Sequence, residues 1–312
     1  MRIELTILFS LCLVACKKES GTTLESDSTT GSWASLAPLP TARQEMPSAH
    51  VAGRIYTPGG YNATGGTVAT LEIYEIPSNR WSMGPSMPQG RNHPGVVAAN
   101  NTVYVIGGYG PGSAAGNVFA FDPAAQSWSS KRSMLTPRAA HVAVEFGGEI
   151  YAIGGVASGG VVGTNERYDP ATDTWTALAA MPTPREHHAA AVIGDRIYVV
   201  GGRAGANSAV LESYSPATNT WQRLPDMPTT RGGLAAAALK GRLYVFGGET
   251  PGVFPHTEEY DPSTNRWRRM TDMPTPRHGM GAVTVGEAIH VIGGGTVAGF
   301  GASTAHEVFS NR

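Results

Sequence analysis

The chain has 312 residues, a formal net charge of −1 and only 15% charged residues. A balanced charge provides no field to attract nucleic acid, and the body of the chain holds no cluster of Lys and Arg, so we expect no nucleic-acid partner. The 40 glycines and 22 prolines favour short strands joined by tight turns. Both cysteines, Cys12 and Cys16, lie in the first sixteen residues, which excludes disulfides, thiolate metal sites and a cysteine nucleophile beyond them.

The first residues are typical of an export signal. Arg2 precedes a largely apolar run, residues 5–15, that is too short to span a bilayer as a helix. This segment resembles the signal of bacterial lipoproteins, whose lipobox is represented here by Leu13, Val14, Ala15 and Cys16. The resemblance implies that residues 1–15 are a signal peptide and that Cys16 carries lipid. An ordinary signal peptide with a coincidental cysteine is the alternative.

Residues 16–31 are polar and are expected to form a disordered tether. Acyl chains on the cysteine would hold the protein on a membrane through this lipid anchor alone. Lys17, where some lipoproteins have Asp, favours the outer membrane by the same resemblance. We therefore expect a lipid-anchored protein of the bacterial cell envelope, on the periplasmic or the surface side.

Three markers recur along the rest of the chain with one period. Gly-Gly pairs begin at Gly59, Gly107, Gly154, Gly201, Gly247 and Gly293, at intervals of 46 to 48 residues. The tryptophans keep the same step at Trp33, Trp81, Trp128, Trp175, Trp221 and Trp267, as do arginines at Arg43, Arg91, Arg138, Arg185, Arg231 and Arg277. A fixed period of this length indicates a repeat architecture.

Each repeat contains four short apolar segments separated by turn residues and without helical periodicity. This pattern predicts four antiparallel strands, which cannot bury both faces alone but can do so when copies surround an axis. The first strand has small residues, as in Ala235–Ala238, and suits a crowded axis. We therefore predict an all-β, six-bladed β-propeller of four-stranded antiparallel blades over residues 32–312.

The repeats resemble the kelch repeat, whose hallmarks are the double glycine, the spaced Tyr and Trp, and a Met-Pro-x-x-Arg segment. Some copies depart from it, because Pro58 interrupts the second strand of the first repeat, Phe119 and Phe121 replace Glu and Tyr, and His290 replaces Tyr. These departures put local strand pairing in doubt. Since no Trp follows the last repeat, the segment with Trp33 is expected to supply the outer strand of the last blade.

Residues after the glycine pairs and around the arginines are expected at one end of every blade, where kelch proteins usually bind partners. These residues vary from blade to blade, as a binding surface would. The candidates are Tyr61, Tyr109, Arg203 and Glu249 after the glycines, and Gln44, Glu45, Asn92, His93, Glu186, His187 and His278 around the arginines.

Several of these features also have a structural interpretation. The repeat arginines are expected to pair with the Glu of each Glu-x-Tyr segment or with Glu307, and His141 and His188 occupy a position where kelch repeats often carry histidine. His93, Glu186 and His187 have the chemistry for proton transfer or metal binding. Nothing in the sequence fixes their geometry, so neither a metal nor another cofactor is predicted.

No familiar catalytic motif appears in the sequence. The favoured function is a monomeric binding or scaffold module that recognises a protein segment or a glycan on its loop face. The alternative is a sugar-acting enzyme, since periplasmic kelch propellers include the sialic-acid mutarotases. Under that alternative, proton transfer would fall to Glu186, His187, Arg203 and Glu249.

Overall fold

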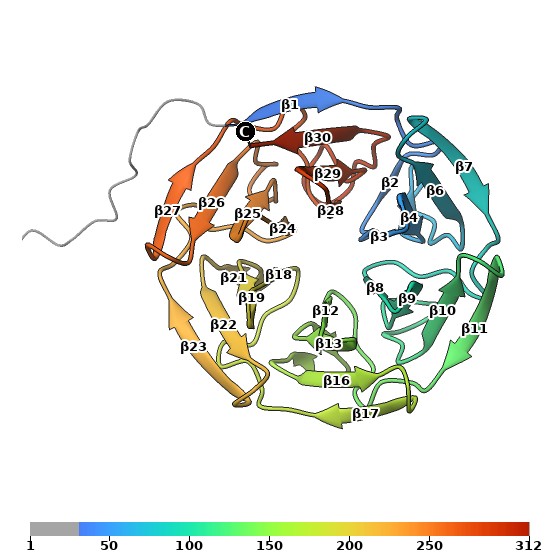
Figure 1. Ribbon diagram of the computed structural model, residues 1–312, viewed down its shortest axis with the longest axis horizontal. Coiled ribbons are helices and arrows are strands. Elements are labelled where there is room, and N and C mark those ends of the chain that lie inside the picture. Colours follow the sequence, from blue (N-terminus) through green and yellow to red (C-terminus); the bar gives the residue numbers. More distant parts are fainter. Residues whose placement is uncertain (1–30, 312) are drawn as a thin grey trace, which may run out of the picture.

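The computed structural model describes residues 31–311, which form a ring of six four-stranded antiparallel sheets around an open axis (Figure 1). The predicted signal peptide, Cys16 and the predicted tether up to residue 30 lie outside the described residues. The predicted six-bladed propeller is confirmed. None of the described residues belongs to a helix long and apolar enough to cross a membrane.

From the axis outward, the six blades consist of the following strands. The first blade contains β3 (Ala49–Val51), β4 (Arg54–Pro58), β6 (Leu71–Glu75) and β7 (Arg80–Gly84). The second contains β8 (Gly95–Ala99), β9 (Thr102–Ile106), β10 (Val118–Asp122) and β11 (Ser127–Lys131). The third contains β12 (Val142–Phe146), β13 (Glu149–Ile153), β16 (Asn165–Asp169) and β17 (Thr174–Ala177). The fourth blade contains β18 (Ala189–Ile193), β19 (Arg196–Val200), β22 (Leu211–Ser215) and β23 (Thr220–Leu224). The fifth contains β24 (Ala235–Leu239), β25 (Arg242–Phe246), β26 (Thr257–Asp261) and β27 (Arg266–Arg269). The sixth contains β28 (Gly281–Val285), β29 (Ala288–Ile292), β30 (His306–Ser310) and β1 (Ser32–Ser35).

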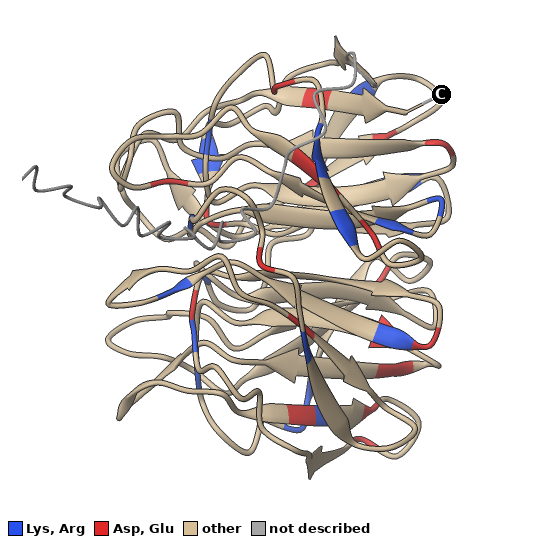
Figure 2. Ribbon diagram, turned by 90° about the vertical axis from the view of Figure 1, so that its left-hand side faces the viewer, with Lys and Arg blue, Asp and Glu red and all other residues tan. Residues whose placement is uncertain are grey.

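Three short ribbons decorate one end of the ring: β2 (Arg43–Gln44) with β5 (Tyr61–Asn62), β14 (Val156–Ala157) with β15 (Gly160–Val161), and β20 (Arg203–Ala204) with β21 (Ala206–Asn207). Seen from the side, acidic and basic residues are interspersed over the strands and loops (Figure 2). This distribution forms no stripe of one sign on the side that is shown.

The N-terminal strand closes the ring. β1 pairs with β30 in antiparallel register, with Trp33 opposite Phe309. The predicted closure of the last blade by the segment with Trp33 is therefore confirmed. β1 thus covers the edge of β30 that would otherwise expose unpaired backbone groups, and the sixth blade has four strands like the other five.

Each tryptophan ties its blade to the preceding one. The indole Nε1 donates to a backbone carbonyl there, over distances of 2.8 to 3.0 Å. The acceptors are the carbonyls of Thr271, Ala37, Pro85, Arg132, Ala179 and Pro225. A large ring that packs between sheets and keeps its polar N–H satisfied contributes to every blade junction.

The departures from the repeat pattern do not disturb strand pairing, so the doubt raised by the sequence was unfounded. Pro58 pairs with Leu71 at the end of β4, beyond the last contact of β4 with β3 at Tyr56 and Ala49. Its missing N–H therefore breaks no bond to β3. β10 keeps its full pairing with β9 and β11, because Phe119 and Phe121 are buried as apolar substitutes.

The repeat arginines are buried, and five of them pair with a buried glutamate of the same blade. The pairs, at 2.5 to 2.9 Å, are Arg43–Glu72, Arg138–Glu166, Arg185–Glu212, Arg231–Glu258 and Arg277–Glu307. This agrees with the pairing expected from the sequence. In the second blade Phe119 replaces the glutamate, and Arg91 instead donates to Gln89 and Asn117 and lies over the Phe119 ring.

Candidate functional site

Backbone hydrogen bonds form a closed ring around the axis. Its members lie two residues after each repeat arginine and all have positive φ, between 50° and 67°. The N–H of each donates to the carbonyl of the member in the preceding blade, at 2.8 to 3.0 Å. The members are Glu45, His93, Ala140, His187, Gly233 and Gly279. We call them the axial ring.

Beside the axial ring, a set of antiparallel β-bridges joins the loop that follows each repeat arginine to the loop that follows the glycine pair. The residue after each repeat arginine pairs antiparallel with the residue that follows the glycine pair of the same blade. The pairs are Gln44–Tyr61, Asn92–Tyr109, Ala139–Val156, Glu186–Arg203, Gly232–Glu249 and His278–Gly295. The two sets of candidate residues therefore meet at one end of the propeller, which we call the loop face.

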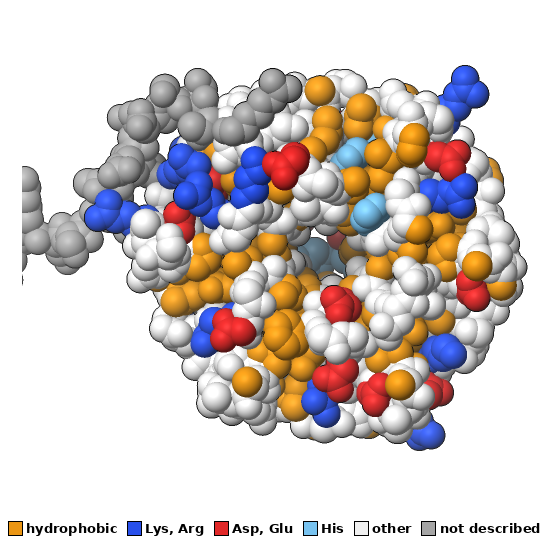
Figure 3. All heavy atoms as spheres, viewed as in Figure 1, with side chains coloured by type: hydrophobic (Ala, Val, Ile, Leu, Met, Phe, Trp, Pro, Cys, Tyr) orange, Lys and Arg blue, Asp and Glu red, His pale blue; other side chains and the backbone are white. Residues whose placement is uncertain are grey.

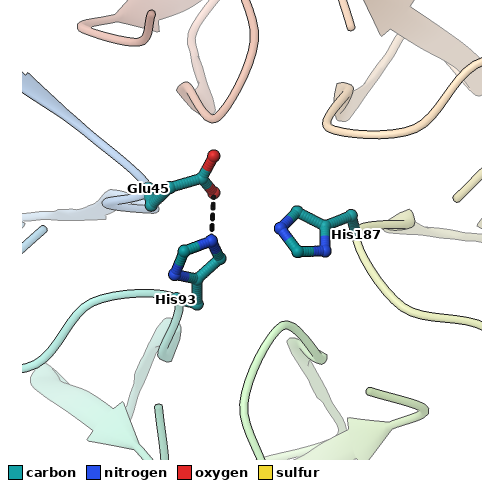
Figure 4. Close-up of side chains that lie close together, drawn as sticks. All are labelled: Glu45, His93 and His187. Atoms are coloured by element: carbon teal, nitrogen blue, oxygen red, sulfur yellow. Dashed lines mark ion pairs between the residues drawn. The ribbon is translucent and has the colours of Figure 1, made fainter. Parts of the chain in front are cut away.

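Three members of the axial ring carry functional side chains, and these converge on the axis (Figure 4). The Nε2 atom of His93 lies 3.4 Å from Oε2 of Glu45. The His187 ring packs edge-on against the His93 ring, with centroids 4.8 Å apart. One buried carboxylate and two imidazoles thus face each other at the centre of the molecule.

Below the ring, the axis is hollow. A cavity of about 140 Å³ is lined by these three side chains and by small residues of the innermost strands, among them Ala143, Ala190 and Ala236. Histidine side chains are visible at depth in the central opening (Figure 3). The small residues predicted for the innermost strands line this space, so the axis is less crowded than the sequence pattern suggested.

Four further charged or titratable side chains surround the three. Arg203 donates to Glu186 at 2.7 Å and to Glu249 at 2.9 Å. Glu186 also contacts Nδ1 of His187. His278 lies between two carboxylates, with Nδ1 3.3 Å from Glu45 and Nε2 3.6 Å from Glu249. The arrangement links residues of five blades in one network.

The network shifts the protonation of its members. Burial lowers the pKa of His187 to about 3, and it also lowers the pKa of His93 despite the nearby Glu45 carboxylate. Burial opposes the charge of His278, but hydrogen bonding and the charges of Glu45 and Glu249 raise its pKa. Burial would raise the pKa of Glu45, yet the surrounding imidazoles, His93 first, hold it below its usual value. Two neutral imidazoles therefore lie beside an ionised carboxylate at neutral pH.

The rim of the loop face is aromatic and partly apolar. Tyr61 packs edge-on against His93 and against Phe300, which belongs to the loop 296–301 of the last blade. This loop is held in place because Glu249 accepts from the N–H of Gly299 at 2.6 Å and Gln44 accepts from the N–H of Gly301 at 2.8 Å. Burial raises the pKa of the Tyr61 hydroxyl, so it stays protonated at neutral pH.

All the predicted candidates thus lie at the loop face, but they divide into two groups. Glu45, His93, Glu186, His187, Arg203, Glu249 and His278 form the axial network, whereas Gln44, Asn92, Tyr61 and Tyr109 bridge the surrounding loops. The trio that meets at the axis contains Glu45 in place of Glu186, which contacts the other nitrogen of His187. Phe300 was not identified from the sequence, because the loops after the glycine pairs differ from blade to blade in sequence and no marker of the repeat points to this position.

The two histidines that were interpreted as structural lie beneath the axial ring. Nε2 of His188 lies 3.0 Å from the carbonyl of Ile153, and its ring packs against Gly154 of the preceding blade. His141 packs in the same way against Gly107. Side chains at this position fill the space under the glycine pairs, so His188 points away from its neighbour His187.

Comparison with known proteins places these repeats in a family. Residues 86–248 and 136–294 match the KLHDC2/KLHL20/DRC7 Kelch-repeats domain, and residues 42–88 match the Kelch motif. The chain belongs to the kelch-repeat family. Kelch-like protein 8 of Mus musculus is 35% identical over 77 residues, which cover 25% of this chain and 12% of that protein. Kelch-like protein 8 of Caenorhabditis elegans is 42% identical over 59 residues, 19% of this chain and 9% of that protein.

This kelch chain therefore spans about a tenth of the length of these curated relatives. The solved structure of YjhT matches with a TM-score of 0.77 over 87% of this chain and 95% of that one, at 17% identity. A likeness at this identity shows the propeller fold and leaves the site to be argued from its own residues.

Proposed function

We propose that this kelch propeller is a protein-binding module that recognises an extended partner segment on its loop face. One observation carries the proposal. Three of the five exposed large hydrophobic side chains in the described residues, Val161, Val297 and Phe300, lie in the loops that follow the glycine pairs. Large apolar side chains exposed on one face of a protein, beside polar groups, are a feature of surfaces that bind partners.

The groups inside this apolar rim supply specificity. Arg203, 27% exposed, and the hydroxyls of Tyr61 and Tyr109 offer hydrogen bonds to a partner backbone or side chain. The underlying frame is rigid, because the axial ring and the loop bridges fix the backbone beneath these side chains. A preformed surface loses little conformational entropy when it binds a partner.

The location of the module is part of the proposal. A lipid on Cys16 and a polar tether over residues 16–31 would hold the propeller at a bacterial membrane, where the loop face would capture a partner of the envelope. Cys16→Ser tests this part separately. Release of the protein from the membrane fraction is expected, and full retention would contradict the anchor.

Capture from native membranes tests the binding surface. The double variant Val297→Ser with Phe300→Ser removes the apolar rim in a loop whose backbone contacts remain, so it should fold normally and lose partner capture. Met83→Ser is the matched control, because Met83 is 57% exposed on the outer strand β7 and Val297 is 60% exposed. Equal capture by the double variant and the wild type would reject the loop face, and enrichment of glycans without protein would reject a protein partner.

Proton transfer on a sugar is a second candidate, favoured by one observation. Neutral imidazoles of His93 and His187 lie in contact with the carboxylates of Glu45 and Glu186 beside an axial cavity. Such pairs can exchange protons with a bound hydroxyl group. Saturation-transfer NMR of sugar anomers distinguishes the two functions, since a binding module leaves the exchange rate unchanged and an enzyme raises it.

A further inference from the structure

Side chains from three blades offer a set of metal ligands at the axis. One ligand atom from each of Glu45, His93 and His187 lies within 4.8 Å of the other two. Two imidazoles and a carboxylate are ligands suited to divalent transition metals. We propose that these three side chains bind a divalent transition-metal ion, with Zn²⁺ as the expected occupant, on the propeller axis.

The separations fit a common ion. Ligand atoms about 2.1 Å from a tetrahedral Zn²⁺ lie about 3.4 Å apart. His93 Nε2 and Glu45 Oε2 are already at 3.4 Å. A ring nitrogen of His187 points toward this pair across the axis (Figure 4), so a small rotation of its side chain completes the set.

The backbone holds the three ligands in place. Each ligand belongs to the axial ring, where its N–H donates to one neighbour and its carbonyl accepts from the other. The positive φ of 50° to 54° at Glu45, His93 and His187 is uncommon for these residue types. A chain that maintains such φ values through a closed ring of hydrogen bonds fixes the direction of the side chains before any ion arrives.

The outer contact of His93 selects the tautomer that a metal requires. Its Nδ1 lies 2.6 Å from Oδ1 of Asn92, and Nδ2 of Asn92 in turn donates to Thr67 at 2.6 Å. The amide is therefore oriented with its oxygen toward His93, which places the imidazole proton on Nδ1. The lone pair of Nε2 is left to face the axis.

The other two ligands have outer contacts of the same kind. Glu186 contacts Nδ1 of His187 and is itself held by Arg203 at 2.7 Å. The second carboxylate oxygen of Glu45 lies 3.3 Å from Nδ1 of His278. A carboxylate behind a metal-binding histidine orients the ring and increases its basicity. Every proposed ligand therefore has an outer partner that directs its free atom toward the axis.

Three protein ligands leave at least one coordination position open. The axial cavity of about 140 Å³ adjoins the three side chains and has room for water or a small ligand atom. A site of this composition resembles open metal sites rather than closed structural ones. The inference goes beyond the proposed protein binding and does not depend on it, because the ligands lie on the axis and not on the apolar rim.

Metal titration of the purified full-length chain tests the site. Zn²⁺ binding is measured by calorimetry, and Co²⁺ binding by its visible absorption, which reports tetrahedral coordination by nitrogen and oxygen. The wild type should bind one equivalent of either ion. Glu45→Gln, His93→Asn and His187→Asn should abolish equimolar binding, while His50→Asn and Glu75→Gln, which lie outside the trio, should bind as the wild type does.

Asn92→Ala provides a test that leaves all three ligands in place. Loss of the outer partner of His93 should weaken binding by about 10- to 100-fold without changing the stoichiometry. Circular dichroism establishes that each variant is folded. The proposal is overturned if the folded wild type binds neither ion at one equivalent, or if folded Glu45→Gln and His187→Asn retain wild-type affinity.

Discussion

Trp33 packs against Phe309 with ring centroids 5.2 Å apart, and this contact joins the first strand of the described chain to the last one. Trp33 also packs edge-on with Phe246 of the fifth blade, with ring centroids 5.6 Å apart. One residue thus closes the sixth blade and connects it to its neighbour. The stability of the ring should depend on this residue more than its partial exposure suggests.

Trp33→Ala should therefore lower the free energy of unfolding by about 3–5 kcal/mol, because it leaves a cavity between two blades and removes the bond to Thr271. Urea denaturation followed by circular dichroism measures the change. Met83→Ala, on an exposed outer strand, is the control and should shift stability by less than about 0.5 kcal/mol. A midpoint for Trp33→Ala equal to that of the control would contradict closure by β1.

The buried arginines allow a comparison between blades. Arg185→Met should cost about 3–5 kcal/mol, because it leaves the carboxylate of Glu212 buried without its ionic partner. Arg91→Met should cost clearly less, since Phe119 replaces the glutamate there and the neutral partners Gln89 and Asn117 lose hydrogen bonds but no counter-ion. If urea denaturation gave the same loss of unfolding free energy for Arg185→Met and Arg91→Met, the buried ion pair would not be the cause of the destabilisation.

Buried histidines should make the protein sensitive to acid. Burial lowers the pKa of His141 well below its ordinary value of 6.5 and that of His306 to about 3. The unfolded chain therefore takes up protons below pH 6.5 that the folded chain cannot, and stability falls as the pH decreases. Each such histidine lowers the free energy of unfolding by up to about 2 kcal/mol as the pH falls from about 7.5 to about 5.

His141→Met isolates one of these contributions. Methionine already occupies the equivalent position in two other blades, at Met46 and Met280, and neither ring nitrogen of His141 has a hydrogen-bond partner among the described residues. The variant should match or exceed wild-type stability at pH 7.5, and its loss of stability on going to pH 5 should be about 2 kcal/mol smaller. An unchanged pH dependence in paired urea titrations would refute the assignment.

Glu249 should control the order of the loop on the rim. Its carboxylate accepts from the N–H of Gly299 at 2.6 Å while it also binds Arg203. Glu249→Gln weakens a charge-assisted bond, so the Gly299 amide should exchange roughly tenfold faster or more in hydrogen-exchange measurements. Glu287→Gln, which removes a surface pair with Lys240, should leave that amide unchanged. Equal protection in both variants would argue against this anchor of the loop.

The sequence predicts the fold because each repeat carries the same residues at the same spacing. The glycine pairs, the tryptophans and the arginines with their glutamates fix the blades, and the position of Trp33 fixes the closure. Local departures such as Pro58 were harder to judge, because their effect depends on where the neighbouring strand ends.

The site was predicted only in outline. The residues of the loop face could be named from their variation, but the axial ring joins Glu45 and His187 with Ala140 and two glycines. Their shared position, two residues after each repeat arginine, can be seen in the sequence. Side chains this unlike do not indicate a common backbone conformation, however, and their positive φ becomes visible only in three dimensions. The meeting of Glu45 with His93 and His187 likewise depends on the geometry of the closed ring.

Site-specific photo-crosslinking on native membranes tests the central claim, that the loop face is the surface that binds a protein partner. A photoreactive residue is placed at Phe300 on the rim, or at Thr218 in an exposed hairpin at the opposite end of the blades. A discrete protein adduct from position 300 and none from position 218 is the predicted result. An adduct from position 218 alone, or the same adducts from both positions, would contradict it.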